Sequence, residues 1–262
     1  MIVAGVDVGA KTVHVVVLDD GRMAAQAAVA SGFDHEESAR QGLAEAARIA
    51  GIDDRGTIEH VAATGAGRKA LSFAKQHPTE VAADGRGAAY LYSGARTVLD
   101  VGAEEARAIR LNDEGKVVDF ALNEKCAAGA GAFVEAMSRA LDMDLDNFAR
   151  ISLDSTATID MNAQCTVFAE SEVVSLIHAN TPAADIARAV HDAMARRVSA
   201  MARRVGLEAP VMLGGGVALN IGFVKALAEA LGGVDVYVPA GAEYLGAYGA
   251  ALIAWETVSV GR

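Results

Sequence analysis

Two copies of the sequence Asp-Val-Gly-Ala, at residues 7–10 and 100–103, hold the side chains with the clearest chemical potential. In each copy an aspartate ends a Val-rich, strand-like stretch and a glycine turn follows. Such a turn suits a phosphate-bound Mg²⁺, because the carboxylate takes the metal or its waters while main-chain amides take the phosphate oxygens. Asp7 and Asp100 are therefore candidate catalytic carboxylates, and the repeat predicts two halves that aim their turns into one cleft.

The sequence that follows each copy also repeats. Leu18 and Leu111 each lie eleven residues after the aspartate, and a turn rich in Asn, Asp and Gly follows both. Each copy therefore predicts a strand, a glycine turn, a second strand, a tight turn and a third strand. A single Asp-x-Gly is most simply a hairpin that requires glycine, whereas two copies in matching contexts favour a binding role.

The two cysteines, Cys126 and Cys165, are the second chemical signal. Each precedes a helix-like segment, and the free amides and dipole at a helix N-terminus favour the thiolate form that binds metal. The pair lacks the close spacing of a zinc site, so two ordinary buried thiols are an open alternative. Two chains related by a two-fold axis would supply four thiolates, the number that a [4Fe–4S] cluster needs.

Other glycine-rich segments suggest ligand contacts. Gly65, Gly67 and Ala70 follow a predicted strand at 58–63 and match a dinucleotide fingerprint with Asp84 as the ribose contact, although a chain that opens with three strands argues against it. The three consecutive glycines at 214–216 favour close approach to a flat ligand.

Helical periodicity predicts the elements that must position these residues. The expected helices are 35–50, 68–76, 186–205, 221–231 and 244–255. The last of these is rich in small residues and should pack tightly against its neighbours. His191, inside the third, has no metal ligand at suitable spacing and is assigned no role.

Length and composition limit the classes of function. The 262 residues are 52% hydrophobic and 22% charged, which predicts a well-cored protein of two domains, at 1–94 (completed by 244–262) and 95–243. A net charge of −11 argues against nucleic acid or an anionic membrane as the main partner. There is no apolar run of bilayer length, and Met1 leads directly into a strand-like stretch, so a cytoplasmic location is expected.

The motifs Asn-Glu-Lys-Cys-Ala-Ala-Gly-Ala-Gly-Ala-Phe at 123–133 and Cys-Thr-Val-Phe-Ala-Glu-Ser-Glu-Val-Val-Ser-Leu at 165–176 resemble the ATPase activators of (R)-2-hydroxyacyl-CoA dehydratases and the ATPase subunits of benzoyl-CoA reductase. The resemblance covers nearly the whole chain. It implies an α/β, actin-like ATPase fold of the acetate and sugar kinase type, with two ribonuclease-H-like lobes and ATP or ADP with Mg²⁺ between them.

The same resemblance implies the site residues. Asp7, with Mg²⁺ bound through water, Asp100 and Glu104 would be catalytic. The implied nucleotide contacts are Gly9, Ala10, Lys11, Thr12, Val13 and His14 in the first loop, Gly102 and Ala103 in the second, Gly129 and Gly131 after the first cysteine, and Gly214, Gly215, Gly216, Asn220 and Glu243 around the adenosine.

Cys126 and Cys165 would be half of the ligands of one [4Fe–4S] cluster, shared with a second copy in a homodimer or with a related ATPase subunit in a heterodimer. Ferredoxin would be the electron donor, and the catalytic subunits of an acyl-CoA reductase or dehydratase the acceptors. The second loop, Ala103-Glu104-Glu105, looks more like the D-type subunit of benzoyl-CoA reductase than like the homodimeric activators. We therefore expect an electron activator of benzoyl-CoA reductase, with a homodimeric dehydratase activator as the alternative.

Two alternatives of another class remain open from the sequence. A small-metabolite kinase of the same superfold would need a catalytic base in the cleft and would leave the cysteines without a function. The second alternative is a regulatory partner that binds nucleotide but does not hydrolyse it. Ala10 supports this alternative, because Ala10 stands where the family has a loop hydroxyl that is a candidate Mg²⁺ ligand.

Overall fold

The computed structural model of the protein describes residues 1–52, 57–123, 130–161 and 166–260. The chain divides into two units, each built around its own β-sheet. The first unit contains Met1–Ala95, Leu111–Val118 and Pro239–Arg262, and the second contains Arg96–Arg110 and Asp119–Val238.

The sheet of the first unit has four strands in the order β3-β2-β1-β4. They are β1 (Ile2–Val8), β2 (Thr12–Asp19), β3 (Arg22–Ala30) and β4 (His60–Thr64). The β1/β2 and β2/β3 pairs are antiparallel, and β4 joins β1 in parallel. The tight turn between β2 and β3 has Asp20 and Gly21 at positive φ, as the hairpin prediction requires.

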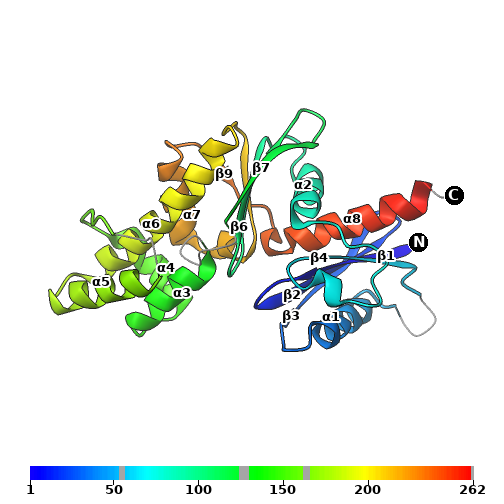
Figure 1. The fold of residues 1–262 in the computed structure, drawn as a ribbon, viewed down its shortest axis with the longest axis horizontal. Helices are drawn as coiled ribbons and strands as arrows, with labels where there is room; N and C mark the ends of the chain where they lie inside the picture. The colour runs from blue at the N-terminus through cyan, green and yellow to red at the C-terminus, as the bar shows by residue number, and fades with distance from the viewer. Residues whose placement is uncertain (53–56, 124–129, 162–165, 261–262) are drawn as a thin grey trace. The chain divides into compact units, whose positions relative to one another are not determined.

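Helices cover both faces of this sheet (Figure 1). Helix α1 (His35–Ile49) packs on one face, and α8 (Leu245–Val260) packs on the other with α2 (Glu80–Leu91) beside it. Gly5 on β1 allows α8 to lie directly on the strand, because a Cβ atom there would lie 2.1 Å from the carbonyl oxygen of Ala247. The expected tight packing of this small-residue helix is confirmed.

The sheet of the second unit has five strands in the order β7-β6-β5-β8-β9. They are β5 (Thr97–Val101), β6 (Ala106–Leu111), β7 (Val117–Asn123), β8 (Val211–Gly214) and β9 (Val236–Tyr237). Its helices are α3 (Gly131–Ala140), α4 (Leu145–Ile151), α5 (Thr166–His178), α6 (Ala183–Arg204) and α7 (Ile221–Ala230). Buried Phe133, Phe148, Phe223 and Met194 belong to the core of this unit.

The two sheets share one arrangement, which confirms the predicted duplication. An antiparallel hairpin (β1/β2 or β5/β6) begins each sheet, and a later strand (β4 or β8) pairs in parallel with the other edge of its first strand. Among the helices of the described ranges, none is both long and apolar enough to cross a membrane.

One predicted helix is wrong. Residues 68–76 form only a short 3₁₀ turn at Arg68–Ala70, and the next helix, α2, begins at Glu80. The residues after this turn run along β4 instead, because the amide of Ala63 donates to Gln76 and the amide of Lys75 donates to Val61. Main-chain bonds to a sheet edge therefore prevail here over local helix propensity.

Candidate functional site

The first aspartate hairpin is closed by main-chain bonds and by one serine. The amide of Gly9 donates to the carbonyl of Thr12 at 3.1 Å. Ser31, just after β3, donates its hydroxyl to the carbonyl of Gly9 at 2.7 Å and its amide to the carbonyl of Lys11 at 2.9 Å. The loop that follows Asp7 is therefore fixed at both of its sides.

The second hairpin repeats this turn with a different support. The amide of Gly102 donates to the carbonyl of Glu105 at 2.9 Å, as Gly9 does to Thr12. Here the support comes from the first turn of α3. The amide of Gly131 donates to the carbonyl of Gly102 at 2.9 Å, and the amide of Ala132 donates to Ala103 at 2.7 Å. The second loop is thus attached directly to a helix.

A glycine with positive φ, at the end of the neighbouring parallel strand, lies close to the carboxylate of each aspartate. Gly65 follows β4, and a Cβ atom there would lie 2.5 Å from Oδ1 of Asp7. Gly215 follows β8, and its Cβ would lie 2.7 Å from Oδ1 of Asp100. Their φ values are +87° and +81°. Gly65 and Gly215 are therefore equivalent positions of the two halves, and neither can carry a side chain without moving a carboxylate.

This equivalence corrects the dinucleotide interpretation of Gly65 and Gly67. The strand before them belongs to a sheet that begins with two antiparallel pairs, unlike a dinucleotide-binding unit. Asp84, the expected ribose contact, is 2% exposed on α2. A Cβ atom at Gly246, in the first turn of α8, would lie 2.6 Å from Oδ2 of Asp7 and 3.3 Å from Oδ1 of Asp84. Asp84 therefore lies near the first aspartate, and both carboxylates border the position that a Cβ of Gly246 would take.

An ion pair holds the second aspartate. Arg107 stands opposite Asp100 in the β5/β6 register, and its Nη1 lies 2.6 Å from Oδ2 of Asp100. Its Nη2 lies 2.5 Å from Oε2 of Glu105. The Arg107 and Asp100 side chains are 12% and 10% exposed, so the pair is largely desolvated. Sequence reasoning missed Arg107, although cross-strand register in the predicted hairpin would have placed it there.

His14 holds the matching place in the first half, opposite Asp7 in the β1/β2 register. Its ring meets that of Tyr244 edge-on, with centroids 5.0 Å apart. Burial, and then the charge of Glu243, raises the pKa of the Tyr244 phenol, which therefore stays neutral. Glu243 thus belongs to the first unit, next to a residue that contacts the first loop.

The remaining predicted contacts differ in exposure. Ala10, Lys11 and Glu104 are exposed at the tips of the two loops, and Thr12 is half-buried. Val13 is fully buried in the core of the first unit, so only its main chain is available to a ligand. Gly214 and Gly215 are buried, whereas Gly216 is exposed and faces open space. Asn220 caps α7 by accepting the amide of Phe223 at 2.9 Å.

Cys126, Cys165 and Gly129 lie outside the described residues. The described helices that follow the two cysteines begin at Gly131 and Thr166. Within the described ranges no group of three or more His, Cys, Asp or Glu side chains could hold a metal ion. In each unit taken by itself, a carboxylate followed by a glycine turn offers the kind of donors that suit a Mg²⁺-bound phosphate, Asp7 with the exposed Lys11 in the first unit and Asp100 in the second.

Residues 4–254 match the BadF/BadG/BcrA/BcrD ATPase family. The chain belongs to this family. Among its relatives, the activator of lactoyl-CoA dehydratase from Anaerotignum propionicum is 38% identical over 98% of both chains. The D-type subunit of benzoyl-CoA reductase from Thauera aromatica is 34% identical over 84% of this chain and 78% of its own.

Solved structures of similar proteins show the same fold. The activator of 2-hydroxyisocaproyl-CoA dehydratase from Clostridium difficile, with bound ADPNP, is 32% identical and matches with a TM-score of 0.93 over 100% of this chain and 97% of its own. A hexokinase of the ROK type from Thermus thermophilus is 17% identical and matches with a TM-score of 0.56 over 99% of this chain and 100% of its own. That second likeness shows the fold alone, which is the expected actin-like, sugar kinase-like ATPase fold.

Proposed function

We propose that this chain is an ATP-dependent activator that uses nucleotide binding to drive electron transfer to a partner acyl-CoA enzyme. The observation that carries the proposal is the attachment of the second loop to α3. Gly131 and Ala132 donate to the carbonyls of Gly102 and Ala103, and Gly131 lies five residues after Cys126. A change in this loop is therefore passed to the helix that follows the first cysteine motif.

In this proposal both aspartate loops bind Mg-ATP or Mg-ADP. Asp7 holds Mg²⁺ through water, and the main chain of Gly9–Val13, with Lys11, binds phosphate. Asp100 and the exposed Glu104 act at the second loop, and Asn220 with Gly214–Gly216 contacts the adenosine. ATP and ADP must favour different conformations for this to work. To change the ratio of the two conformations from 1:99 to 99:1, a nucleotide must bind one conformation about 5.5 kcal/mol more tightly than the other.

We assign Cys126 and Cys165 to a [4Fe–4S] cluster shared by two subunits. Two thiols per chain are half of the four thiolates that such a cluster needs, so the donor set fits a dimer. When bound, the cluster supplies a low-potential electron. The role of this chain is to hold the cluster, to link it to the nucleotide loops and to dock on the electron acceptor, with ferredoxin as the donor.

The extent of similarity supports a dehydratase as the first candidate for the partner enzyme. The lactoyl-CoA dehydratase activator matches nearly end to end, and the benzoyl-CoA reductase component matches over a smaller share. Benzoyl-CoA reductase is the second candidate, favoured by Ala103-Glu104-Glu105 in the second loop. Glu105 is part of the Arg107 ion pair, so the identity of this loop bears directly on Asp100.

Anaerobic purification tests the proposal. The protein is prepared alone and together with any co-encoded related ATPase subunit, and iron content and ATP hydrolysis are measured. The expected result is about four irons per dimer, the content of a single cubane cluster. Four irons in the protein prepared alone would indicate a homodimer, and four irons only in the preparation with the related subunit would indicate a heterodimer. Phosphorylation of a small metabolite by an iron-free protein would favour the kinase alternative instead.

A further inference from the structure

His191 is a fully buried histidine on α6, and its surroundings bring it close to the start of α7. Its exposed fraction is 0%. The ring lies 5.3 Å, between centroids, from that of Phe148, and its Cε1 atom would be 3.1 Å from a Cβ placed on Gly222. A side chain on Gly222 would also meet Ser152 Oγ at 2.3 Å. The first turn of α7 is therefore packed directly against the imidazole.

Hydrogen bonding defines which nitrogen of the ring carries the proton. Nδ1 lies 2.7 Å from the carbonyl oxygen of Ala187, which can only accept, so Nδ1 is the donor. Burial is the main reason that the pKa of His191 is lowered to about 4, and the ring is therefore neutral at neutral pH. Nε2 is then a lone-pair acceptor.

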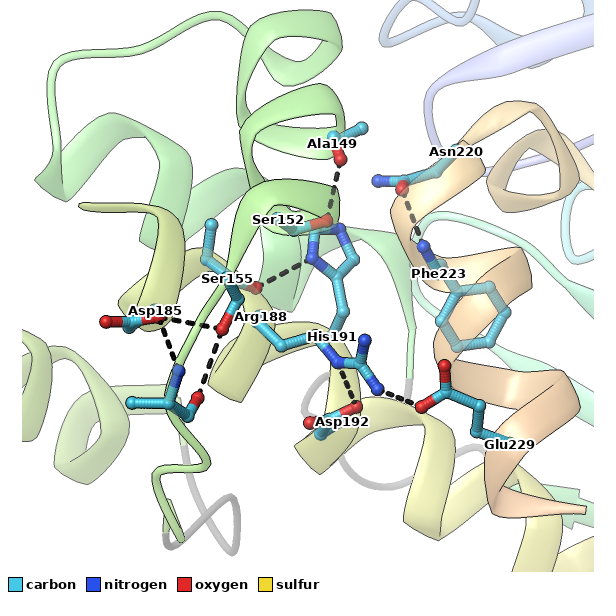
Figure 2. Close-up of polar contacts among 12 residues, drawn as sticks. Ala149, Ser152, Ser155, Asp185, Arg188, His191, Asp192, Asn220, Phe223 and Glu229 are labelled. Carbon is cyan, nitrogen blue, oxygen red and sulfur yellow. Dashed lines mark hydrogen bonds and ion pairs between the residues drawn. The ribbon is translucent and has the colours of Figure 1, made fainter. Parts of the chain in front are cut away.

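This acceptor is buried and has no hydrogen-bond partner in the described part of the chain. A buried polar atom without a partner is costly, which makes it a sign of a function or of a bond completed in another state. The side chain of Asn220 lies beside the His191 ring (Figure 2), and its interaction with the ring raises the pKa of His191 against the larger, opposite effect of burial. This contact does not reach the geometry of a full hydrogen bond to Nε2. A carboxamide carries a donor as well as an acceptor, so Asn220 can supply the missing donor.

The carboxamide oxygen of Asn220 is already engaged in a hydrogen bond. Its Oδ1 accepts the amide of Phe223 at 2.9 Å, so its Nδ2 is the end that remains available to donate. Asn220 also directly follows the short turn Gly216–Leu219. This turn begins just after Gly215, the glycine that lies close to the Asp100 carboxylate. The carboxamide of Asn220 therefore lies where three elements meet: α6, the N-terminus of α7 and the glycine loop at 214–216.

We propose that His191 is a positioning residue for nucleotide, which accepts a hydrogen bond from Asn220 and so fixes the carboxamide and the adjoining glycine loop when the nucleotide is bound. This rests on the proposed function, in which Asn220 and Gly214–Gly216 contact the adenosine. In this structure Nε2 has no hydrogen bond of good geometry, and contacts of this kind often tighten only when the ligand binds. Binding of nucleotide shortens the Asn220–His191 contact to a full hydrogen bond and so satisfies the buried acceptor.

The affinity of the full chain for Mg-ADP, measured by calorimetry, tests this role, with the melting temperature as a second readout. His191→Phe keeps a ring but removes both nitrogens, and it should weaken Mg-ADP binding about tenfold, the effect of one lost hydrogen bond at a binding contact. His191→Gln, which retains an acceptor, should recover part of that loss. In an Asn220→Ala background, His191→Phe should have no further effect, because both substitutions remove the same bond.

A readout independent of affinity comes from ¹⁵N NMR of histidine-labelled protein. The His191 ring should show a protonated Nδ1 and an unprotonated Nε2, and Mg-ADP should shift the Nε2 resonance. Wild-type affinity in His191→Phe, or effects of the two substitutions that simply add, would overturn this inference alone. A wild-type protein that binds no Mg-ADP would overturn the proposed function and this inference with it.

Discussion

The amide of Gly131, at the first residue of α3, donates to the carbonyl of Gly102 at 2.9 Å. Gly131 has little room for a side chain there, since a Cβ atom would lie 2.9 Å from Cγ2 of Val217 and 3.2 Å from the carbonyl oxygen of Gly102. The helix that follows the first cysteine motif is therefore in main-chain contact with the second aspartate loop. In the proposed activator, this contact transmits the conformational change between the ATP-bound and ADP-bound loop to the helix that follows Cys126.

Gly246→Ala should displace the first aspartate. The new Cβ would lie 2.6 Å from Oδ2 of Asp7, so the carboxylate or α8 must move. We expect weaker binding of Mg-ATP, measured by calorimetry, and a loss of about 1–3 kcal/mol in the free energy of unfolding. Gly94→Ala is the matched control, because the atom nearest to its new Cβ, Cζ of Tyr92, would be 4.0 Å away. Equal Mg-ATP affinities in the two variants would contradict the placement of Asp7.

Arg107→Met should strongly destabilise the second unit. It removes the cation from a largely buried pair and leaves the Asp100 charge without its ion-pair partner, at a cost of about 3 kcal/mol in the free energy of unfolding. Adding Asp100→Asn should recover much of this loss, since the uncompensated charge is then gone. Glu105→Gln is the control, and its more exposed pair with Arg107 should cost about 1 kcal/mol or less. Chemical denaturation measures all of these proteins, and additive losses at Asp100 and Arg107 would contradict the pair.

Stability should fall as the pH is lowered from about 6.5 to 4, in part because of His191. Burial first, with a smaller effect of the Arg188 charge, lowers the pKa of this histidine from 6.5 to about 4. The unfolded chain therefore binds more protons than the folded one in this window, and up to about 3 kcal/mol of stability is lost as the pH falls through it. Denaturation curves at pH 4 to 7 should show a shallower pH slope for His191→Phe than for the wild type. Parallel slopes would mean that His191 titrates normally.

Cys126→Ser should abolish cluster binding and leave nucleotide binding near that of the wild type, because the side chain of Cys126 is not among the proposed nucleotide contacts and serine is close to cysteine in size. Iron content after anaerobic purification and Mg-ADP affinity are the two measurements. A variant that retains a full complement of iron would reject Cys126 as a ligand, whereas loss of both properties would indicate misfolding.

Turn chemistry explains why much of the fold could be predicted. The repeated Asp-Val-Gly-Ala with its downstream turns specifies two hairpins locally, and the structure has both. The glycine triplet after the strand-like residues 211–213 likewise follows a real strand, β8. These features depend on residues close together in the chain.

Contacts between distant segments could not be predicted in this way. The equivalence of Gly65 and Gly215 appears only when β4 and β8 take matching places beside the aspartate strands. The predicted helix at 68–76 failed because its residues bond to β4. His191 was assigned no role from its sequence neighbours, since Asn220 reaches it only through the packing of α7 on α6.

The most direct test of the proposed coupling is the EPR spectrum of the reduced, anaerobically purified protein with Mg-ADP and with Mg-ATP, compared between the wild type and Gly131→Val. We predict a cluster signal that changes between the two nucleotides in the wild type. In Gly131→Val, where the helix is pushed away from Gly102, the signal should persist but lose most of its response to nucleotide. A wild-type cluster signal that is identical with both nucleotides would contradict the central claim that the aspartate loops control the cluster.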